Sequence, residues 1–141
     1  MNLVADVPPS SGSAREIHID VDDPSCLRPL RRMLATFLAD RPEDLRIDAD
    51  LVATELVTNA LEHATAPRSV SIGFLHAGRL EIAVTDSAPD TSPTLGRSRL
   101  GTHRGRGLTI VDHLSIWGVD RHRASKTIWA VLGGGRRTAP A

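Results

Sequence analysis

The chain has 141 residues, enough for one domain with a single hydrophobic core. Its 17 Lys and Arg residues balance 17 Asp and Glu residues, so nothing in the overall charge indicates a nucleic-acid or anionic-membrane partner. A single cysteine, Cys26, excludes an internal disulfide and fits a reducing cytosol, so we expect a cytoplasmic location. There is no apolar run near the length of a membrane span, and we expect no membrane contact.

The first half of the chain is predicted to contain one strand and two helices. Residues 1–13 are rich in breakers and polar residues, so we expect a disordered leader there. Polar and apolar residues alternate over 15–21, which predicts a strand at a sheet edge. Apolar residues at helical spacing up to Ala39 predict the first helix, with Pro24 early in its first turn. The second helix is predicted to begin near Glu43.

The second half of the chain is predicted to be rich in strands. Alternating apolar residues predict strands at 69–75, 80–85, 115–119 and 127–132. Residues 76–79 are expected to form a tight hairpin in which Gly78 supplies an unusual φ. Residues 87–104 show no periodicity and contain several Pro and Gly residues, which is typical of a functional lid or a disordered insert. A short amphipathic helix is expected at 108–114.

The predicted element order is strand, helix, helix, strand, strand, lid, helix, strand, strand. This order favours an α/β (α+β) two-layer sandwich, in which helices cover one face of a mostly antiparallel mixed sheet. It does not fit a doubly wound βαβ array. We therefore expect a single ordered domain at 14–132, followed by a flexible tail at 133–141.

The strongest functional signal lies in residues 55–64, Glu-Leu-Val-Thr-Asn-Ala-Leu-Glu-His-Ala. Their apolar members fall on one side of a helix, whereas Glu55 and Asn59 lie one turn apart on another side. Asn is a mediocre helix former because its amide competes for backbone hydrogen bonds, so the presence of Asn59 in the middle of this predicted helix needs an explanation. One interpretation is a solvent-exposed polar face. The other is a site in which Asn59 binds Mg²⁺ and Glu55 polarises a hydroxyl or a water molecule.

Two polar residues in the predicted sheet are candidates for the same site. Asp86 ends a predicted strand, and a carboxylate there can accept a hydrogen bond from an exocyclic amino group such as that of adenine. Thr127, on the last predicted strand, could add a hydroxyl to the same pocket. Taken alone, each has a simpler interpretation: a turn for Asp86 and strand propensity for Thr127.

A glycine-containing segment precedes the last predicted helix. Gly105-Arg106-Gly107 leads into Leu108, and such glycines let backbone N–H groups approach an anion at a helix N-terminus. Arg104 and Arg106 could add charge-assisted contacts to phosphate oxygens. A lone Gly-x-Gly is weak evidence, and the segment fits neither the P-loop pattern nor the dinucleotide-binding fingerprint. The segment therefore predicts a phosphate site only in combination with the residues above.

Together these segments resemble the ATP-binding superfamily of gyrases, heat-shock chaperones, histidine kinases and mismatch-repair proteins. Within it, the chain is similar to the bacterial anti-sigma-factor serine/threonine kinases over roughly 15–132. Residues 55–64 resemble the N-box of that group, and residues 105–112 resemble its second glycine box. Residues 117–119 and 126–129 resemble its closing strands.

The resemblance implies ATP and Mg²⁺ as cofactors. It implies that Asn59 binds the magnesium that bridges the phosphates, and that Glu55 is the general base toward a substrate serine or threonine. It also implies that Asp86 reads the adenine amino group, while Gly105 and Gly107 hold the phosphates. Such proteins act by partner switching: the kinase sequesters a sigma factor and phosphorylates an antagonist that competes for it. A homodimer is compatible with this function, and direct binding of nucleic acid is not expected.

Three functional hypotheses stay open at this point. The first is a serine/threonine protein kinase of the anti-sigma type. The second is a scaffold that only sequesters a protein partner, motivated by residues 86–90, where Asp-Ser-Ala-Pro-Asp replaces the family's Asp-x-Gly-x-Gly. The third is a histidine-kinase catalytic domain, which we disfavour because the sequence has no room for a dimerisation-and-phosphoacceptor helix pair.

Overall fold

The computed structural model describes residues 16–88 and 109–133. Its elements are β1 Glu16–Asp20, η1 Pro24–Cys26, α2 Leu27–Phe37, α3 Glu43–His63, β2 Ser69–Phe74, η2 His76–Gly78, β3 Arg79–Asp86, a helix at 109–114, β4 Ile116–Arg121 and β5 Lys126–Gly133. The expected leader at 1–13, most of the expected lid at 87–104 and residues 134–141 lie outside the described residues. The expected tail starts one residue too early, because Gly133 still pairs with Arg79 in the sheet.

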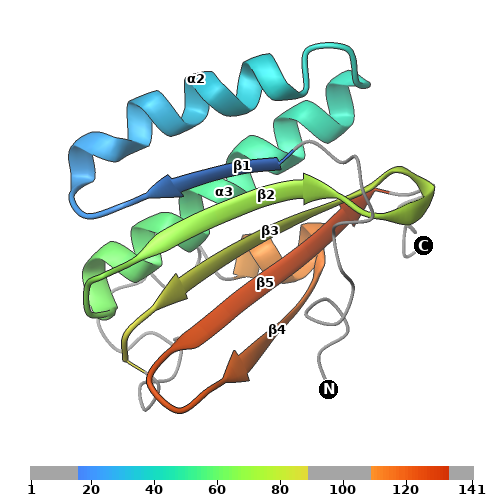
Figure 1. Cartoon of the computed structure of the whole chain (residues 1–141). Coiled ribbons are helices and arrows are strands. Elements are labelled where there is room, and N and C mark those ends of the chain that lie inside the picture. The colour runs from blue at the N-terminus through green and yellow to red at the C-terminus, as the bar shows by residue number, and fades with distance from the viewer. Residues whose placement is uncertain (1–15, 89–108, 134–141) are drawn as a thin grey trace.

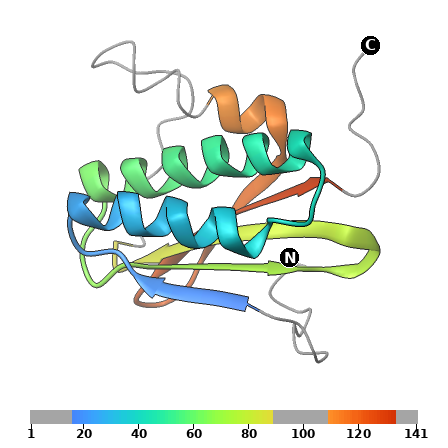
Figure 2. The same cartoon turned by 90° about the horizontal axis from the view of Figure 1, so that it is seen from above.

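The described strands form one sheet in the order β1-β2-β3-β5-β4, and every neighbouring pair is antiparallel. Strand β1 lies at an edge, as its sequence predicts. Figures 1 and 2 show α2, α3 and the 109–114 helix over the same face of the sheet. The predicted two-layer α/β sandwich is therefore confirmed.

The hydrophobic core lies between the sheet and the helices. Because side chains alternate along a strand, every second residue of the central strands points toward the helices. These buried strand residues are Val70, Ile72, Leu80, Ile82, Val84, Ile128, Ala130 and Leu132. Helix α3 packs on them with Val52, Ala53, Leu56, Val57 and Ala60, all of them buried. This packing fixes the rotation of α3 about its axis, and with it the direction of the polar residues on its other sides.

The first helix differs from its prediction at both ends. The Asp23 side chain accepts a hydrogen bond from the Ser25 backbone N–H at 2.8 Å and caps a short 3₁₀ turn at Pro24–Cys26. The α-helix then begins at Leu27 and ends at Phe37. A short aspartate side chain that binds a nearby N–H favours such a tight turn over a regular first helical turn.

The connection between β2 and β3 contains two residues with positive φ. Gly78 has a φ of 73°, as the sequence predicts, but Ala77 also adopts a φ of 60°. The Leu75 N–H donates to the Arg79 carbonyl oxygen at 2.7 Å and closes the turn. An alanine in this conformation is unfavourable because its Cβ approaches the following carbonyl, so the turn carries local strain.

Candidate nucleotide site

Glu55 and Asn59 lie on the side of α3 that points away from α2. The opposite side is marked by Asp50, whose carboxylate accepts two hydrogen bonds from Arg31 of α2, at 2.9 and 2.8 Å. Each residue advances a helix by about 100°, so Asn59 lies about 180° around from Asp50, and Glu55 about 140°. Figure 2 shows α3 between α2 and the 109–114 helix. Glu55 and Asn59 are therefore directed toward the side on which the 109–114 helix lies.

The Glu55 carboxyl group has an environment suited to proton transfer. Its side chain is half-buried, and burial raises the pKa of Glu55 above its ordinary value. The nearby Glu62 carboxylate raises this pKa further by repulsion. A carboxylate with a raised pKa accepts a proton more readily at neutral pH than an ordinary surface carboxylate.

Asp86 is buried and paired with a lysine. It is the last residue of β3 and lies opposite Lys126, the first residue of β5. The Lys126 Nζ is 2.7 Å from one carboxylate oxygen of Asp86, and the Ala88 backbone N–H donates to the other at 2.7 Å. The two side chains are only 1% and 4% exposed, for Asp86 and Lys126 respectively. Each carboxylate oxygen of Asp86 thus already accepts one hydrogen bond, and each can accept one more.

The end of β3 is tied to the segment that follows α3. The Ser87 N–H donates to the Thr65 carbonyl oxygen at 3.0 Å, and the Ser87 hydroxyl donates to the Pro67 carbonyl oxygen at 3.2 Å. These bonds hold Asp86 at the end of the sheet that borders the C-terminal end of α3. The fold thereby brings Asp86 to the same end of the molecule as the helix segment that carries Asn59.

The sequence analysis placed the Thr127 hydroxyl in the same pocket as Asp86, but in the structure Thr127 lies on the other face of the sheet. It is the register partner of Thr85, and the two hydroxyl oxygens are 2.8 Å apart. Because neighbouring residues of a strand point to opposite faces, Thr127 faces away from the helices, whereas Lys126 faces them. The residue that reaches Asp86 is therefore Lys126, which the sequence analysis missed. Lys126 could have been found from the sequence, because it lies two residues before Ile128 and therefore faces the same buried side of the strand.

The glycine-containing segment cannot be placed. Arg104, Gly105, Arg106, Gly107 and Leu108 lie outside the described residues.

The helix that follows this segment is anchored to the domain. Val111 is buried in the core, and the Trp117 indole N–H donates to the Asp112 carboxylate at 3.0 Å. The 109–114 helix is thus fixed between the core and β4, on the side of α3 away from α2 (Figure 2).

The donor set of the described residues fits a magnesium ion that arrives with a nucleotide. In the ranges 16–88 and 109–133, no group of three or more His, Cys, Asp or Glu side chains could hold a metal ion alone. Asn59 and Glu55 offer an amide oxygen and a carboxylate one helical turn apart. Mg²⁺ is commonly held by one or two protein oxygens together with phosphates and water, so the single amide oxygen of Asn59 fits such an ion and leaves the Glu55 carboxylate free of it. In the same ranges, no helix combines the length and apolar character needed to span a bilayer.

Comparison with known families decides the kind of domain. The family model of the histidine kinase-like ATPase domain matches residues 21–129, well over half of the chain. The chain belongs to this family. Its match covers α2, α3, β2, β3, the segment 104–108, the 109–114 helix and β4, and it ends within β5. The predicted relationship to the histidine-kinase and gyrase type of ATP-binding domain is therefore confirmed.

Two solved structures share the fold at low sequence identity. The RsbU and RsbW domains of Rv1364c from Mycobacterium tuberculosis align with a TM-score of 0.57 and 19% identity, over 86% of this chain and 32% of that one. The histidine kinase domain of a blue-light activated histidine kinase from Erythrobacter litoralis EL346 aligns with a TM-score of 0.50 and 16% identity, over 77% and 59%. This ATPase-family chain thus spans about a third of the first structure and under two thirds of the second. Among curated proteins, none matches the chain.

Proposed function

We propose that this member of the histidine kinase-like ATPase family binds ATP with Mg²⁺ and phosphorylates a serine or threonine of a regulatory protein. The observation that carries the proposal is the direction of Glu55 and Asn59 on α3. Both are directed to the side on which the 109–114 helix lies (Figure 2). Residues 109–112 of this helix belong to the segment that resembles a second glycine box. An arrangement with these two side chains facing α2 would have left no route to a shared ligand.

Each site residue has a distinct role in this proposal. Asn59 holds Mg²⁺ through its amide oxygen, and Asp86 accepts the adenine amino group at the end of β3. Gly105 and Gly107 donate backbone N–H groups to the phosphates, with Arg104 and Arg106 adding charge. Leu108 continues the chain from this phosphate site into the helix.

Phosphoryl transfer assigns the base to Glu55. When bound, ATP with Mg²⁺ supplies the γ-phosphoryl group. Glu55 accepts the proton of the substrate hydroxyl while that oxygen bonds to the phosphorus and the bond to the ADP oxygen breaks. The raised pKa of Glu55 favours this proton transfer over that of a fully solvated carboxylate. The charge of Glu62 raises this pKa further.

The partners proposed for this activity are a sigma factor, which the protein sequesters, and an antagonist protein, which it phosphorylates. The support is the resemblance of residues 55–64 and 105–112 to the anti-sigma kinases, together with a fold shared with a structure that includes an RsbW domain. A homodimer and a cytoplasmic location belong to the same proposal.

Nucleotide binding is tested by thermal unfolding with ATP and Mg²⁺. A ligand at one hundred times its Kd adds about 2.7 kcal/mol to the free energy of unfolding. We expect this gain for the unaltered protein and its loss in Asn59→Ala. Asp50→Asn is the matched control, because Asp50 lies on the opposite side of the same helix. Equal gains in all three proteins would remove the role of Asn59.

Phosphoryl transfer is tested separately with labelled ATP and a cognate antagonist protein. We expect Glu55→Ala to keep the ATP-dependent gain in stability but to lose transfer. Equal transfer by the unaltered protein, Glu55→Ala and Asn59→Ala would refute both assigned roles.

A scaffold that only sequesters its partner is the second candidate function. The observation that favours it is the buried pair of Asp86 and Lys126, because each oxygen of the carboxylate proposed to read adenine already accepts one hydrogen bond within the protein. Pro89 also stands in the segment where the family has glycines. Tight binding of a partner that survives Asn59→Ala and ignores ATP would favour this function over the kinase.

A further inference from the structure

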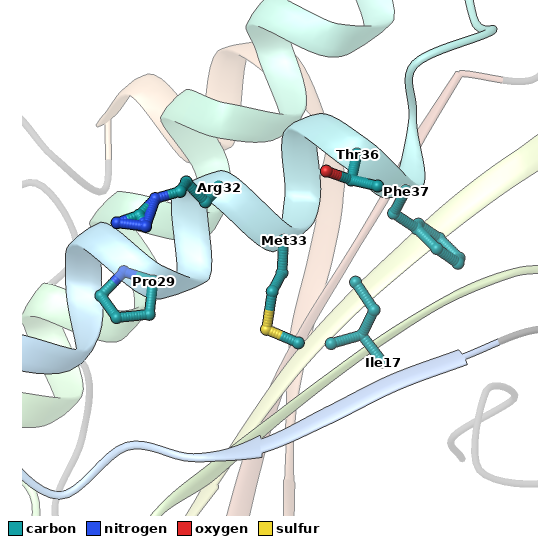
Figure 3. Close-up of a pocket in the computed structure, with 6 residues that line it drawn as sticks. All are labelled: Ile17, Pro29, Arg32, Met33, Thr36 and Phe37. Atoms are coloured by element: carbon teal, nitrogen blue, oxygen red, sulfur yellow. The ribbon is translucent and has the colours of Figure 1, made fainter.

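An apolar groove runs between helix α2 and the edge strand β1, away from the candidate nucleotide site. Its volume is about 500 Å³, and its lining residues are Ile17, Pro29, Arg32, Met33, Thr36 and Phe37. Figure 3 shows the side chains of Met33 and Phe37 extending from α2 toward Ile17 on β1, with Pro29 one turn before Met33. The groove therefore follows one side of α2 over about two turns.

The exposed methionine in this groove is unusual for a helix with its own core stripe. Leu30 and Leu34 form the buried stripe of α2, whereas Met33 keeps 43% of its surface exposed. Phe37 is held in place by stacking on Phe74, with ring centroids 5.4 Å apart. A flexible methionine beside a fixed aromatic ring is a surface that can adapt to apolar side chains of a partner.

The charge around the groove has one sign on the helix side. Helix α2 contains Arg28, Arg31 and Arg32 and no acidic residue. Arg31 is paired with Asp50, but Arg28 and Arg32 have no ion-pair partner among the described residues. Arg32 lines the apolar groove and also a second depression of about 640 Å³, which Arg28 and Arg31 share. The apolar groove is thus lined by one cationic side chain, Arg32, and neighboured by a second, Arg28, neither of which has an ion-pair partner within 16–88 and 109–133.

We propose that this groove binds an amphipathic helix of a partner protein whose apolar side chains are flanked by acidic ones. Apolar residues of such a helix at i, i+4 and i+7 would fill the space beside Met33, and its carboxylates would meet Arg28 and Arg32. The inference deepens the proposed function, on which it rests for the idea that this chain holds a protein partner. It adds the place and the chemistry of that contact.

A second copy of the chain fits this edge less well. Ile17 and Ile19 lie on the helix side of β1, so Glu16, His18 and Asp20 share its other side. In an antiparallel pairing of two β1 strands centred on His18, Glu16 of each copy would lie opposite Asp20 of the other. Like charges directly opposite one another destabilise strand pairing. The charges therefore favour a helix beside α2 over a second β1 strand beside β1.

The test is selection from a displayed library of random peptides of about 16 residues, roughly four helical turns. We expect enriched peptides to carry apolar residues at helical spacing with acidic neighbours. Their affinity should fall on the order of tenfold for Met33→Glu and for the pair Arg28→Glu with Arg32→Glu. Exchanging the peptide's acidic residues for lysines should restore binding to the double arginine variant.

The matched control is Ile47→Glu, because Ile47 is a similarly exposed apolar residue, at 50%, on α3 outside the groove. It should leave peptide affinity unchanged. Failure to enrich any peptide, enrichment of basic or extended sequences, or equal binding to Met33→Glu would overturn the proposal. ATP-dependent stabilisation, measured on the same variants, should be unaffected. Loss of that stabilisation in the unaltered protein, with peptide binding intact, would instead count against the proposed nucleotide site.

Discussion

The buried pair of Asp86 and Lys126 makes a strong prediction about stability. The Lys126 Nζ lies 2.7 Å from Asp86 Oδ2, and both side chains are almost fully buried. Lys126→Met keeps most of the volume of the side chain but leaves the Asp86 carboxylate buried, with only the Ala88 N–H as a described partner. Removing one member of a buried pair costs about 3 to 5 kcal/mol. For a domain of this size, we expect the melting temperature to fall by roughly 12 to 20 °C.

Chemical denaturation of four proteins measures how strongly the two residues are coupled. They are the unaltered protein, Lys126→Met, Asp86→Asn and the double variant. Asp86→Asn keeps an acceptor for the Ala88 N–H, so the double variant should recover much of the loss, with a coupling of about 1 to 3 kcal/mol. Arg31→Met is the control, because it breaks a pair in which Arg31 is 56% exposed, and it should cost under about 1 kcal/mol. If Lys126→Met cost no more than Arg31→Met, the reasoning from burial would be refuted.

Three further predictions concern the sheet and its turn. Burial, with neighbouring carboxylates, raises the pKa of Glu81 to about 7, so the folded protein keeps a proton that the unfolded chain has lost. The free energy of unfolding should therefore fall as the pH rises from about 4.5 to 7. Glu81→Gln should flatten this profile and add about 1 kcal/mol at about pH 8, after allowance for the partial exposure of the side chain. An unchanged profile would contradict the raised pKa of Glu81. A Cβ at Gly118 would lie 2.6 Å from the Trp129 ring, so Gly118→Ala should cost about 1 to 3 kcal/mol in urea unfolding, and a neutral result would mean that the ring moves freely. Ala77→Gly should stabilise the protein by about 0.5 to 1 kcal/mol, because φ at this position is 60°. Gly78→Ala should destabilise it by about 1 kcal/mol, because φ is 73° there, although no atom lies close to the added Cβ. The opposite signs would refute the strain argument.

Much of the fold was predictable because its patterns are local. The apolar stripe of α3 and the alternation of the strands follow from helical and strand periods, and both match the buried residues of the core. The edge position of β1 was also predicted correctly. The bounds of the elements were predicted less well, as in the later start of α2, where the Asp23 side chain caps a short 3₁₀ turn.

The candidate site was predictable in part. Spacing alone placed Glu55 and Asn59 on one side of α3, but not toward a particular neighbour. That direction depends on the packing of α3 on the sheet and on the Arg31–Asp50 pair with α2.

The sequence by itself determined which faces of the helices and strands are apolar, since each face is set by residues within a few positions of one another. Only the tertiary structure decided that Asp86 meets Lys126, 40 residues later, and that Thr127 turns to the opposite face beside Thr85. The physical reason is the register of β3 with β5. A shift of one residue would exchange the two faces, and the register is selected by the packing of the whole core.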